Sequence, residues 1–485
     1  MGWRPFYYAL AAGVFLAAAW PIRAEDKDAE IAEMRRTMRE MQKTISQLQG
    51  RVTTLEREKS NNKSPAPASG ARSSGSVYAP PAAAGGGGAI PSQTSSIKDR
   101  DTFLDLQSSA PRVNNEPLAG TLKGFMAIPG TDTIVKLGGN VRLDTILDGK
   151  DNGNPNKFIP SSFPDDRPHG SYRSQVTASS SRLSLEVRRP VPDGTLRIYY
   201  ENDFSGDSSA TGNTYRLRQL YGQAWNFLVG QTYSAFMDVD AFPDVVDAQG
   251  PNGLINRRLP QIRYTIPFTR GLSLAIGVEQ PATDMDLSSD RYGSNAHSYS
   301  RIPDIASHLR WEEKSDETHV QLGGILRNLA YESDSGRKKA IGWGVSLSGA
   351  VDVFKDDHFS GQATYGQGIE RYIQDTSGLG QDAALDERDG LRPLEVFGLA
   401  VGYTHAWNQQ WKSTVTYGYV HSQAQPILGP EAFTGSQYVS FNILWQPTSS
   451  FRMGLEYLYG IKDTVDAGSP NGQRLDFVIR YDLVR

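Results

Sequence analysis

Beyond residue 130 the chain alternates between apolar and polar residues over many short stretches. In residues 133–147, Leu137 and Val141 occupy one set of alternate positions, and Lys136 and Arg142 occupy the other. This period of two is that of a β-strand, in which successive side chains point to opposite faces of the sheet. The pattern therefore predicts strands with one apolar face and one charged face.

Sixteen stretches show this alternation, and they begin near residues 133, 175, 194, 214, 227, 257, 271, 303, 317, 338, 357, 394, 411, 436, 450 and 472. Short and long connections alternate between them, except that residues 333–337 form a short connection where a long one is due. An even number of antiparallel strands with tight turns at one end is typical of an outer-membrane barrel. We therefore predict an all-β fold, a 16-stranded antiparallel transmembrane β-barrel over residues 124–485.

A soluble all-β sandwich with one wet face is the alternative, because it shows the same alternation. Such a sandwich buries its apolar face against a second sheet, whereas the opposite face here is charged on nearly every stretch. Aromatic residues also gather at the ends of the stretches, where the interfacial girdles of a barrel lie. They include Trp407, Trp411, Trp445, Tyr457 and Tyr459. Because every backbone amide must be paired in lipid, the predicted sheet has to close.

The N-terminus has the layout of an export signal. Arg4 precedes an apolar run over residues 6–20, and a small residue, Ala24, stands at the expected cleavage point. The run is shorter than the about 20 residues that a spanning helix needs. We predict a signal peptide over residues 1–24, and an uncleaved membrane anchor is the alternative.

A heptad pattern follows, and it predicts a coiled coil over residues 25–59. Its core positions, spaced alternately three and four residues apart, are Ile31, Met34, Met38, Met41, Ile45, Leu48, Val52 and Leu55. A lone helix of this length is marginal in water, so the pattern indicates self-association. A single amphipathic helix resting on another surface is the alternative. Residues 60–123 begin with a stretch rich in Pro, Gly and Ser and are predicted to form a flexible linker.

Composition removes several classes of function. The chain of 485 residues has no cysteine, which excludes disulfides, thiol catalysis and Cys-ligated zinc. Its formal charge of -4 gives no indication of nucleic-acid binding. The pair His405 and Ser413, which a simple hairpin would bring together on the outer face, is the one catalytic candidate. Since the sequence identifies no orienting acid or oxyanion hole beside it, we predict no enzyme, no cofactor and no metal.

Two features of the charged face predict what crosses the barrel. One is a series of cations on the early strands: Lys136, Arg142, Arg182, Arg188, Arg197, Arg216, Arg218 and Arg263. The other is the long fifth connection, with Asp238, Asp240, Asp244 and Asp247, which we expect to fold inward and narrow the pore. Arginines facing this constriction loop favour the passage of anions. The alternative is that the arginines only solvate the lumen and pair with Glu186, Glu201 and Asp203.

Several motifs resemble those of the DcaP-like outer-membrane porins. They are Ile128 to Asp144, Ser181-Arg182-Leu183, Gly230 to Tyr233, Phe236-Met237-Asp238, Gln249 to Gly253, Pro260 to Tyr264 and Leu455 to Gly460. The resemblance spans the barrel and includes the preceding coiled coil. It implies a homotrimer in the outer membrane of a Gram-negative bacterium, with the coiled coil in the periplasm, and the uptake of dicarboxylates and other small anions.

Two functions follow as hypotheses. The first is a porin that forms a water-filled channel for passive diffusion of small anionic solutes, dicarboxylates among them. The second is a structural outer-membrane protein whose coiled coil anchors the barrel within the envelope. In both, the expected partners are outer-membrane lipid, further copies of the chain and a periplasmic contact of the coiled coil.

Overall fold

The computed structural model describes residues 102–112, 124–164, 172–206, 213–269, 271–313, 318–354 and 357–483. All of them belong to a compact unit that spans residues 90–485. The predicted signal peptide, the coiled coil and most of the predicted linker lie outside the described residues. Within the described residues, no helix is both long and apolar enough to cross a membrane.

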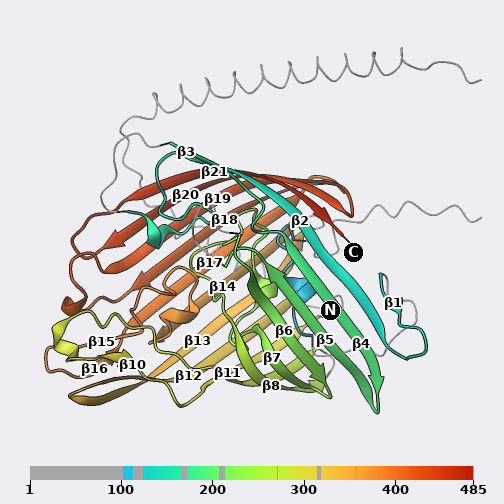
Figure 1. Ribbon diagram of the computed structural model, residues 1–485. Helices are drawn as coiled ribbons and strands as arrows, with labels where there is room; N and C mark the ends of the chain where they lie inside the picture. Colours follow the sequence, from blue (N-terminus) through green and yellow to red (C-terminus); the bar gives the residue numbers. More distant parts are fainter. Residues whose placement is uncertain are drawn as a thin grey trace, which may run out of the picture. The chain divides into compact units, whose positions relative to one another are not determined.

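The described strands form one closed antiparallel sheet (Figure 1). Its sixteen members are β2 (Ile134–Asp148), β4 (Arg182–Val191), β5 (Gly194–Asp203), β6 (Arg216–Ala224), β7 (Phe227–Tyr233), β8 (Arg258–Thr269), β9 (Leu272–Glu279), β11 (Asp304–Glu312), β12 (His319–Ser333), β13 (Gly336–Phe354), β14 (Asp357–Gln367), β17 (Glu395–Ala406), β18 (Trp411–Ser422), β19 (Phe433–Thr448), β20 (Phe451–Thr464) and β21 (Asn471–Asp482). Each pairs with the next in this order, and β21 pairs with β2 from Asn140↔Asp482 to Asp148↔Arg474. The predicted 16-stranded barrel is therefore confirmed.

Minor elements decorate this sheet. Two short strands add to its margins, β1 (Met126–Ala127) against β2 and β10 (His297–Ser298) against β12. A separate hairpin consists of β15 (Ala383–Leu385) and β16 (Leu391–Pro393). The 3₁₀ turns are η1 (Gln107–Ser109), η2 (Pro160–Ser162), η3 (Val239–Ala241), η4 (Asp290–Tyr292), η5 (Glu370–Tyr372) and η6 (Pro426–Leu428).

The second barrel strand differs from the prediction because it is interrupted. β3 (Arg173–Thr177) pairs with the last residues of β2, and the strand resumes as β4 only at Arg182. The Ser181 hydroxyl holds the bend, since it accepts from the Arg142 amide at 3.0 Å and donates to the Arg142 carbonyl at 3.1 Å. The short connection predicted at 333–337 is present as the tight turn between β12 and β13.

The two faces of the sheet have opposite character. On β2 the outward side chain of Val141 is 58% exposed, whereas its neighbour Arg142 is 3% exposed and points inward. Leu322 and Leu326 are outward and exposed in the same way on β12. Because the sheet closes on itself, no second sheet covers these apolar side chains, and the sandwich alternative is wrong. The apolar surface suits contact with lipid, and the charged surface lines the interior.

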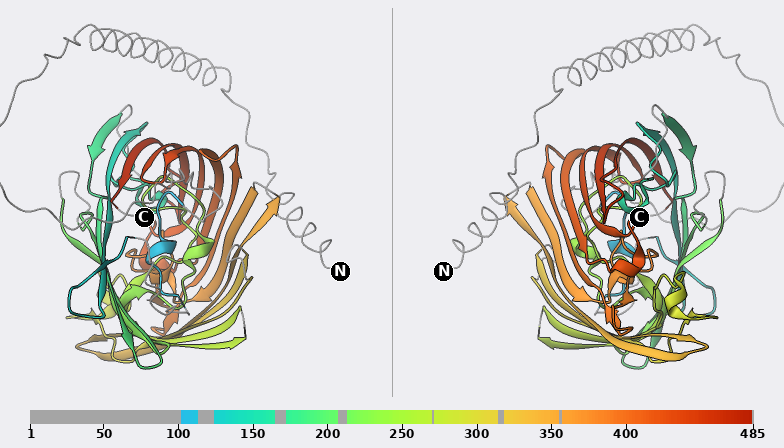
Figure 2. Two further views of the ribbon diagram at one scale, coloured as in Figure 1. Left: turned by 90° about the vertical axis from the view of Figure 1, so that its right-hand side faces the viewer. Right: turned by 90° about the vertical axis from the view of Figure 1, so that its left-hand side faces the viewer.

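Several chain segments lie inside the ring of strands (Figure 2). One is the connection between β7 and β8, residues 234–257, and a second is residues 102–112, which we name the luminal segment. The flexible linker predicted over residues 60–123 differs from the structure in this second segment, where Phe103, Leu104 and Leu106 are buried. Phe103 packs with Val246, Leu444 and Val478. Burial of these closely spaced apolar side chains against other apolar residues of the lumen removes them from water, which is favourable.

A charge on the outer face tests this orientation. Leu326 stands in the middle of β12 and is 56% exposed. Leu326→Arg should lower the free energy of unfolding in phospholipid vesicles by about 2–4 kcal/mol, because a cation near the bilayer midplane loses its hydration. Urea titration measures it, with Ser335→Arg in the exposed β12–β13 turn as the control. A neutral effect of Leu326→Arg would contradict lipid exposure of this face.

Candidate functional site

The connection 234–257 crosses the lumen and is tied to the far wall by its aspartates. Asp238 accepts from Arg310 at 3.0 Å and from Ser348 at 2.7 Å, and it contacts His319 at 2.9 Å. These partners lie on β11, β13 and β12 respectively. Burial opposes the charge of Asp238, but His319 and Arg310 hold its pKa below the usual range. The carboxylate therefore stays ionised and fixes the start of the connection to three strands.

The remaining aspartates continue this attachment around the barrel. Asp240 forms ion pairs of 2.6 Å with both Arg112 and Arg310. Asp244 contacts Lys412 on β18 and accepts from the Phe103 amide at 2.6 Å. Asp247 accepts from the Phe158 amide at 3.2 Å, while its own amide donates to Glu456 on β20. All four predicted aspartates thus lie inside the barrel and join the connection to its wall.

Glycines on the inner face allow the connection to lie directly against the strands. A Cβ added to Gly402 on β17 would lie 2.5 Å from Pro243, and one added to Gly398 would lie 2.6 Å from the Gly253 carbonyl oxygen. Glycine within a strand often marks such a close backbone approach. This inner-face glycine pair is a sequence signal of the inward fold in addition to the four aspartates.

The opposite wall, from β4 to β8, carries most of the predicted cations, and several have carboxylate partners there. Arg188 and Arg197 both lie 2.7 Å from Glu186. Arg218 pairs with Glu201 at 2.5 Å and with Asp203 at 2.8 Å, and Arg216 also pairs with Asp203. These contacts are the ones expected from the alternative stated above, in which luminal arginines pair with Glu186, Glu201 and Asp203. For these four arginines the pairing is therefore real.

The other predicted cations are held differently. Arg142 pairs with Asp144 and donates to the Val246 carbonyl at 2.7 Å. Arg263 donates to Gln261 at 3.0 Å and to the Tyr233 carbonyl. Arg182 donates to the Leu104 carbonyl at 2.9 Å, with no carboxylate within salt-bridge distance among the described residues. Arg142 thus lies against the connection 234–257, whereas Arg182 lies near the wall cation Arg218.

The wall between β4 and β8 holds an excess of positive charge. Arg182 begins β4, Arg216 begins β6 and Arg258 begins β8, so all three lie at the end of the strands away from the short turns. Lys157, from the connection after β2, joins them. We name as the cationic cluster Lys157, Arg182, Arg216, Arg218 and Arg258, with the two carboxylates Glu201 and Asp203 among them.

Electrostatics of this cluster are those of incompletely neutralised cations. Five cations stand against two carboxylates, which leaves three positive charges. Arg258 lies over the ring of Tyr233 at 5.6 Å and, like Lys157, has no ion-pair partner in the described part of the chain. Burial, and then the positive charge of Arg216, lowers the pKa of Lys157 to about 8. The cluster is therefore a site that favours an added anion.

Sequence reasoning missed Lys157 and Arg258. Arg258 follows Arg257 at the strand start expected near residue 257, so its position was available, but its inward direction was not assigned. Lys157 lies in a long connection without periodicity, and no pattern in the sequence indicates that it returns to the lumen.

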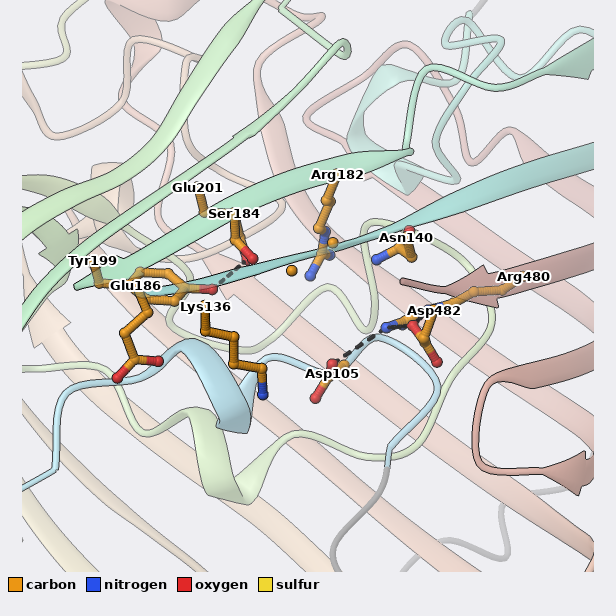
Figure 3. Close-up of a pocket in the computed structure, with 12 residues that line it drawn as sticks. Asp105, Lys136, Asn140, Arg182, Ser184, Glu186, Tyr199, Glu201, Arg480 and Asp482 are labelled. Carbon is orange, nitrogen blue, oxygen red and sulfur yellow. Dashed lines mark hydrogen bonds and ion pairs between the residues drawn. The ribbon is translucent and has the colours of Figure 1, made fainter. Parts of the chain in front are cut away.

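A small cavity lies next to the cluster, between β2, β4, β5 and β21. It encloses about 80 Å³, and its charged lining residues are the cations Lys136, Arg182 and Arg480 and the carboxylates Asp105, Glu186, Glu201 and Asp482 (Figure 3). Asn140 and Ser184 add uncharged polar groups, and Asp105 of the luminal segment pairs with Arg480 at 3.2 Å on one side. Arg182 thus borders both the cavity and the cationic cluster.

The outer face holds one arrangement that differs from the sequence analysis. Asp357 on β14 contacts His405 Nδ1, which supplies the orienting acid that the sequence did not identify. The acid lies on a neighbouring strand 48 residues away, and only the register reveals it. Ser413 does stand opposite His405, yet its hydroxyl accepts from the Trp407 indole at 2.9 Å. Among the described residues, no hydrogen bond joins His405 to Ser413.

A closed sixteen-stranded barrel with a charged interior and an inward-folded connection defines the class of outer-membrane porins. The family model of the DcaP outer membrane protein matches residues 120–483. The chain therefore belongs to the DcaP outer membrane protein family. Comparison with curated proteins gives no match.

Solved structures agree with this fold. The crystal structure of the outer-membrane channel DcaP of Acinetobacter baumannii is 24% identical, with a TM-score of 0.65, and the match covers 75% of this chain and all of that one. The anion-selective porin from Comamonas acidovorans is 12% identical, with a TM-score of 0.50, over 72% of this chain and all of that one.

Acid should release the connection from the wall. Because the folded-state pKa of Asp238 lies below its unfolded value of about 3.9, its contribution to stability is fully present above that pH and is lost progressively as the pH falls from there through the folded-state pKa. We expect channel conductance in planar bilayers to become unstable below about pH 4. Asp238→Asn/Asp240→Asn should show the same fluctuations at pH 7, and the exposed control Asp466→Asn should not. Steady conductance of the double variant would show that the aspartates do not hold the connection.

Proposed function

We propose that this outer-membrane porin is a diffusion channel selective for small anions, and that dicarboxylates are among its solutes. The single observation that carries the proposal is the excess of three positive charges in the cationic cluster on the wall of the lumen. Cations that lack a carboxylate partner favour an anion that enters, and a guanidinium binds a carboxylate through two parallel hydrogen bonds.

Dicarboxylates fit because cations are available at two neighbouring places. Arg258 and Lys157 belong to the cluster, Lys136 lines the adjacent cavity, and Arg182 borders both. One carboxylate of a short diacid can bind on each side of Arg182. A monocarboxylate of the same length gains only one such contact, so diacids should permeate with the stronger preference.

Removing the unpaired cations tests selectivity. The triple variant Lys157→Gln/Arg182→Gln/Arg258→Gln leaves two cations against two carboxylates, so its cluster is neutral. In a KCl gradient across a planar bilayer, the parent channel should give an anion-selective reversal potential, and the triple variant should lose most of it.

Arg388→Gln serves as the matched control, because Arg388 lies on an exposed outer connection. It removes a positive charge without touching the lumen, and its reversal potential should equal that of the parent. Unchanged anion selectivity in the triple variant would mean that the cluster does not select the solute.

The predicted coiled coil has a separate role in this proposal. We place it in the periplasm as the element that holds three copies together, since an isolated helix of residues 25–59 is marginal in water. The alternative function, a structural tether, uses the same element.

Deleting residues 25–59 separates the two functions. We expect conductance per barrel and anion selectivity to persist, while trimers dissociate at lower detergent concentration in native electrophoresis. Loss of envelope integrity in cells that express the deleted chain, with conductance intact, would instead favour the tether.

A further inference from the structure

The luminal segment, residues 102–112, occupies the space between the inward connection and the cationic wall. On one side the Phe103 amide donates to Asp244, Gln107 donates to the Val239 carbonyl at 3.2 Å, and Arg112 pairs with Asp240. On the other side the segment meets β4, β5 and β6. It therefore bridges the part of the lumen that the proposed anion path uses.

On the wall side, the backbone carbonyls of the segment accept from side chains of the barrel. Arg182 donates to the Leu104 carbonyl at 2.9 Å, Arg197 to the Ala110 carbonyl at 3.3 Å and Arg480 to the Phe103 carbonyl. The uncharged donors Tyr221 and Gln223 bond the carbonyls of Ser109, at 3.1 Å, and Arg112, at 2.7 Å. The segment thus presents a row of carbonyl oxygen atoms to cationic and uncharged donors of the wall.

Arg182 would form a stronger bond with a carboxylate. A hydrogen bond between a guanidinium and an ionised oxygen is about twice as strong as one between neutral groups. For Arg182 the Leu104 carbonyl is a neutral acceptor where no carboxylate is within salt-bridge distance. In Figure 3 the Arg182 side chain lies in the same cavity as Asn140 and close to the luminal segment. A solute carboxylate that reaches Arg182 therefore competes with the Leu104 carbonyl for the same N–H groups.

The contacts that attach the segment to the barrel can be replaced by contacts with a solute. Its only regular element is the three-residue turn η1, and it forms no strand pairing with the barrel. Side-chain hydrogen bonds and the burial of Phe103, Leu104 and Leu106 hold it in place. Segments held without a backbone ladder open more readily than the strands around them.

We propose that residues 102–112 are an internal plug, which closes the anion path by occupying the donors of cations that face it, Arg182 above all, and which a dicarboxylate solute displaces. The proposal rests on the proposed function, because the plug competes for the cations that are expected to bind the solute. It adds regulation to that function: the channel opens in response to the solute that it conducts.

Conductance tests closure. Replacing residues 102–112 with a Gly/Ser stretch of equal length should raise single-channel conductance in KCl by about twofold or more, because a filled level of the pore becomes open. A synthetic peptide with the sequence of residues 102–112 should then block the open variant, and a scrambled peptide of the same composition should not. Unchanged conductance, or equal block by both peptides, would overturn the plug.

Thiol labelling tests displacement in the full chain. The protein has no native cysteine, so Ser109→Cys and Ala110→Cys each introduce a single reporter at a position that is at most 4% exposed. Labelling by the neutral reagent N-ethylmaleimide should be slow, and it should accelerate about tenfold or more with saturating succinate, a competition worth about 1.4 kcal/mol or more. The uncharged diamide of succinate should have no effect.

Ser450→Cys in the exposed β19–β20 turn is the control, and its labelling should be fast and independent of succinate. Fast labelling of both buried reporters without succinate, or no acceleration by succinate, would overturn the plug. The reversal potential of the Gly/Ser variant distinguishes the two proposals. If the Gly/Ser variant is open but lacks anion selectivity, the proposed anion channel is refuted. The proposal that residues 102–112 close the parent channel would still hold.

Discussion

The need to pair every backbone amide is the constraint on which the rest of the structure depends. In lipid an unpaired sheet edge is too costly, so β21 pairs with β2 and the sheet closes. Closure sends one face of each strand outward and the other inward. The outward residues are apolar and the inward residues are charged, because only the interior offers water and counter-charges. The charged lumen is thus a consequence of closure, and its detailed charge balance determines what it can bind.

Most inward charges are compensated within the protein. The aspartates of the connection 234–257 bind cations of the far wall, and Glu186, Glu201 and Asp203 bind arginines of the near wall. What remains is a local excess around Arg182, Arg258 and Lys157. A buried ion pair contributes fixed geometry, whereas a cation without a carboxylate contributes attraction for an incoming anion. The alternative of paired arginines and the proposed anion site therefore apply to the same wall: its paired arginines fix the geometry, and its unpaired cations attract the anion.

The sequence predicted the strands well because period-two alternation is a local property of each segment. It also located Asp238, Asp240, Asp244 and Asp247, whose connection was too long for a hairpin. It did not predict the interruption before Arg182, the return of Lys157 to the lumen or the Asp357–His405 contact, because these depend on register and on distant segments. The luminal segment was missed for a related reason. Phe103, Leu104 and Leu106 form a short apolar group without periodicity, and only the finished barrel provides the surfaces that bury them.

One measurement tests the central claim, that the cationic cluster binds the carboxylates of a passing solute. Crystals soaked in bromosuccinate would locate the solute directly through the anomalous scattering of bromine. The account predicts a bromine peak in the lumen, with carboxylate density at Arg182 and at Arg258 or Lys157. Anomalous peaks confined to the exterior, with the lumen free of solute at saturating concentration, would contradict it.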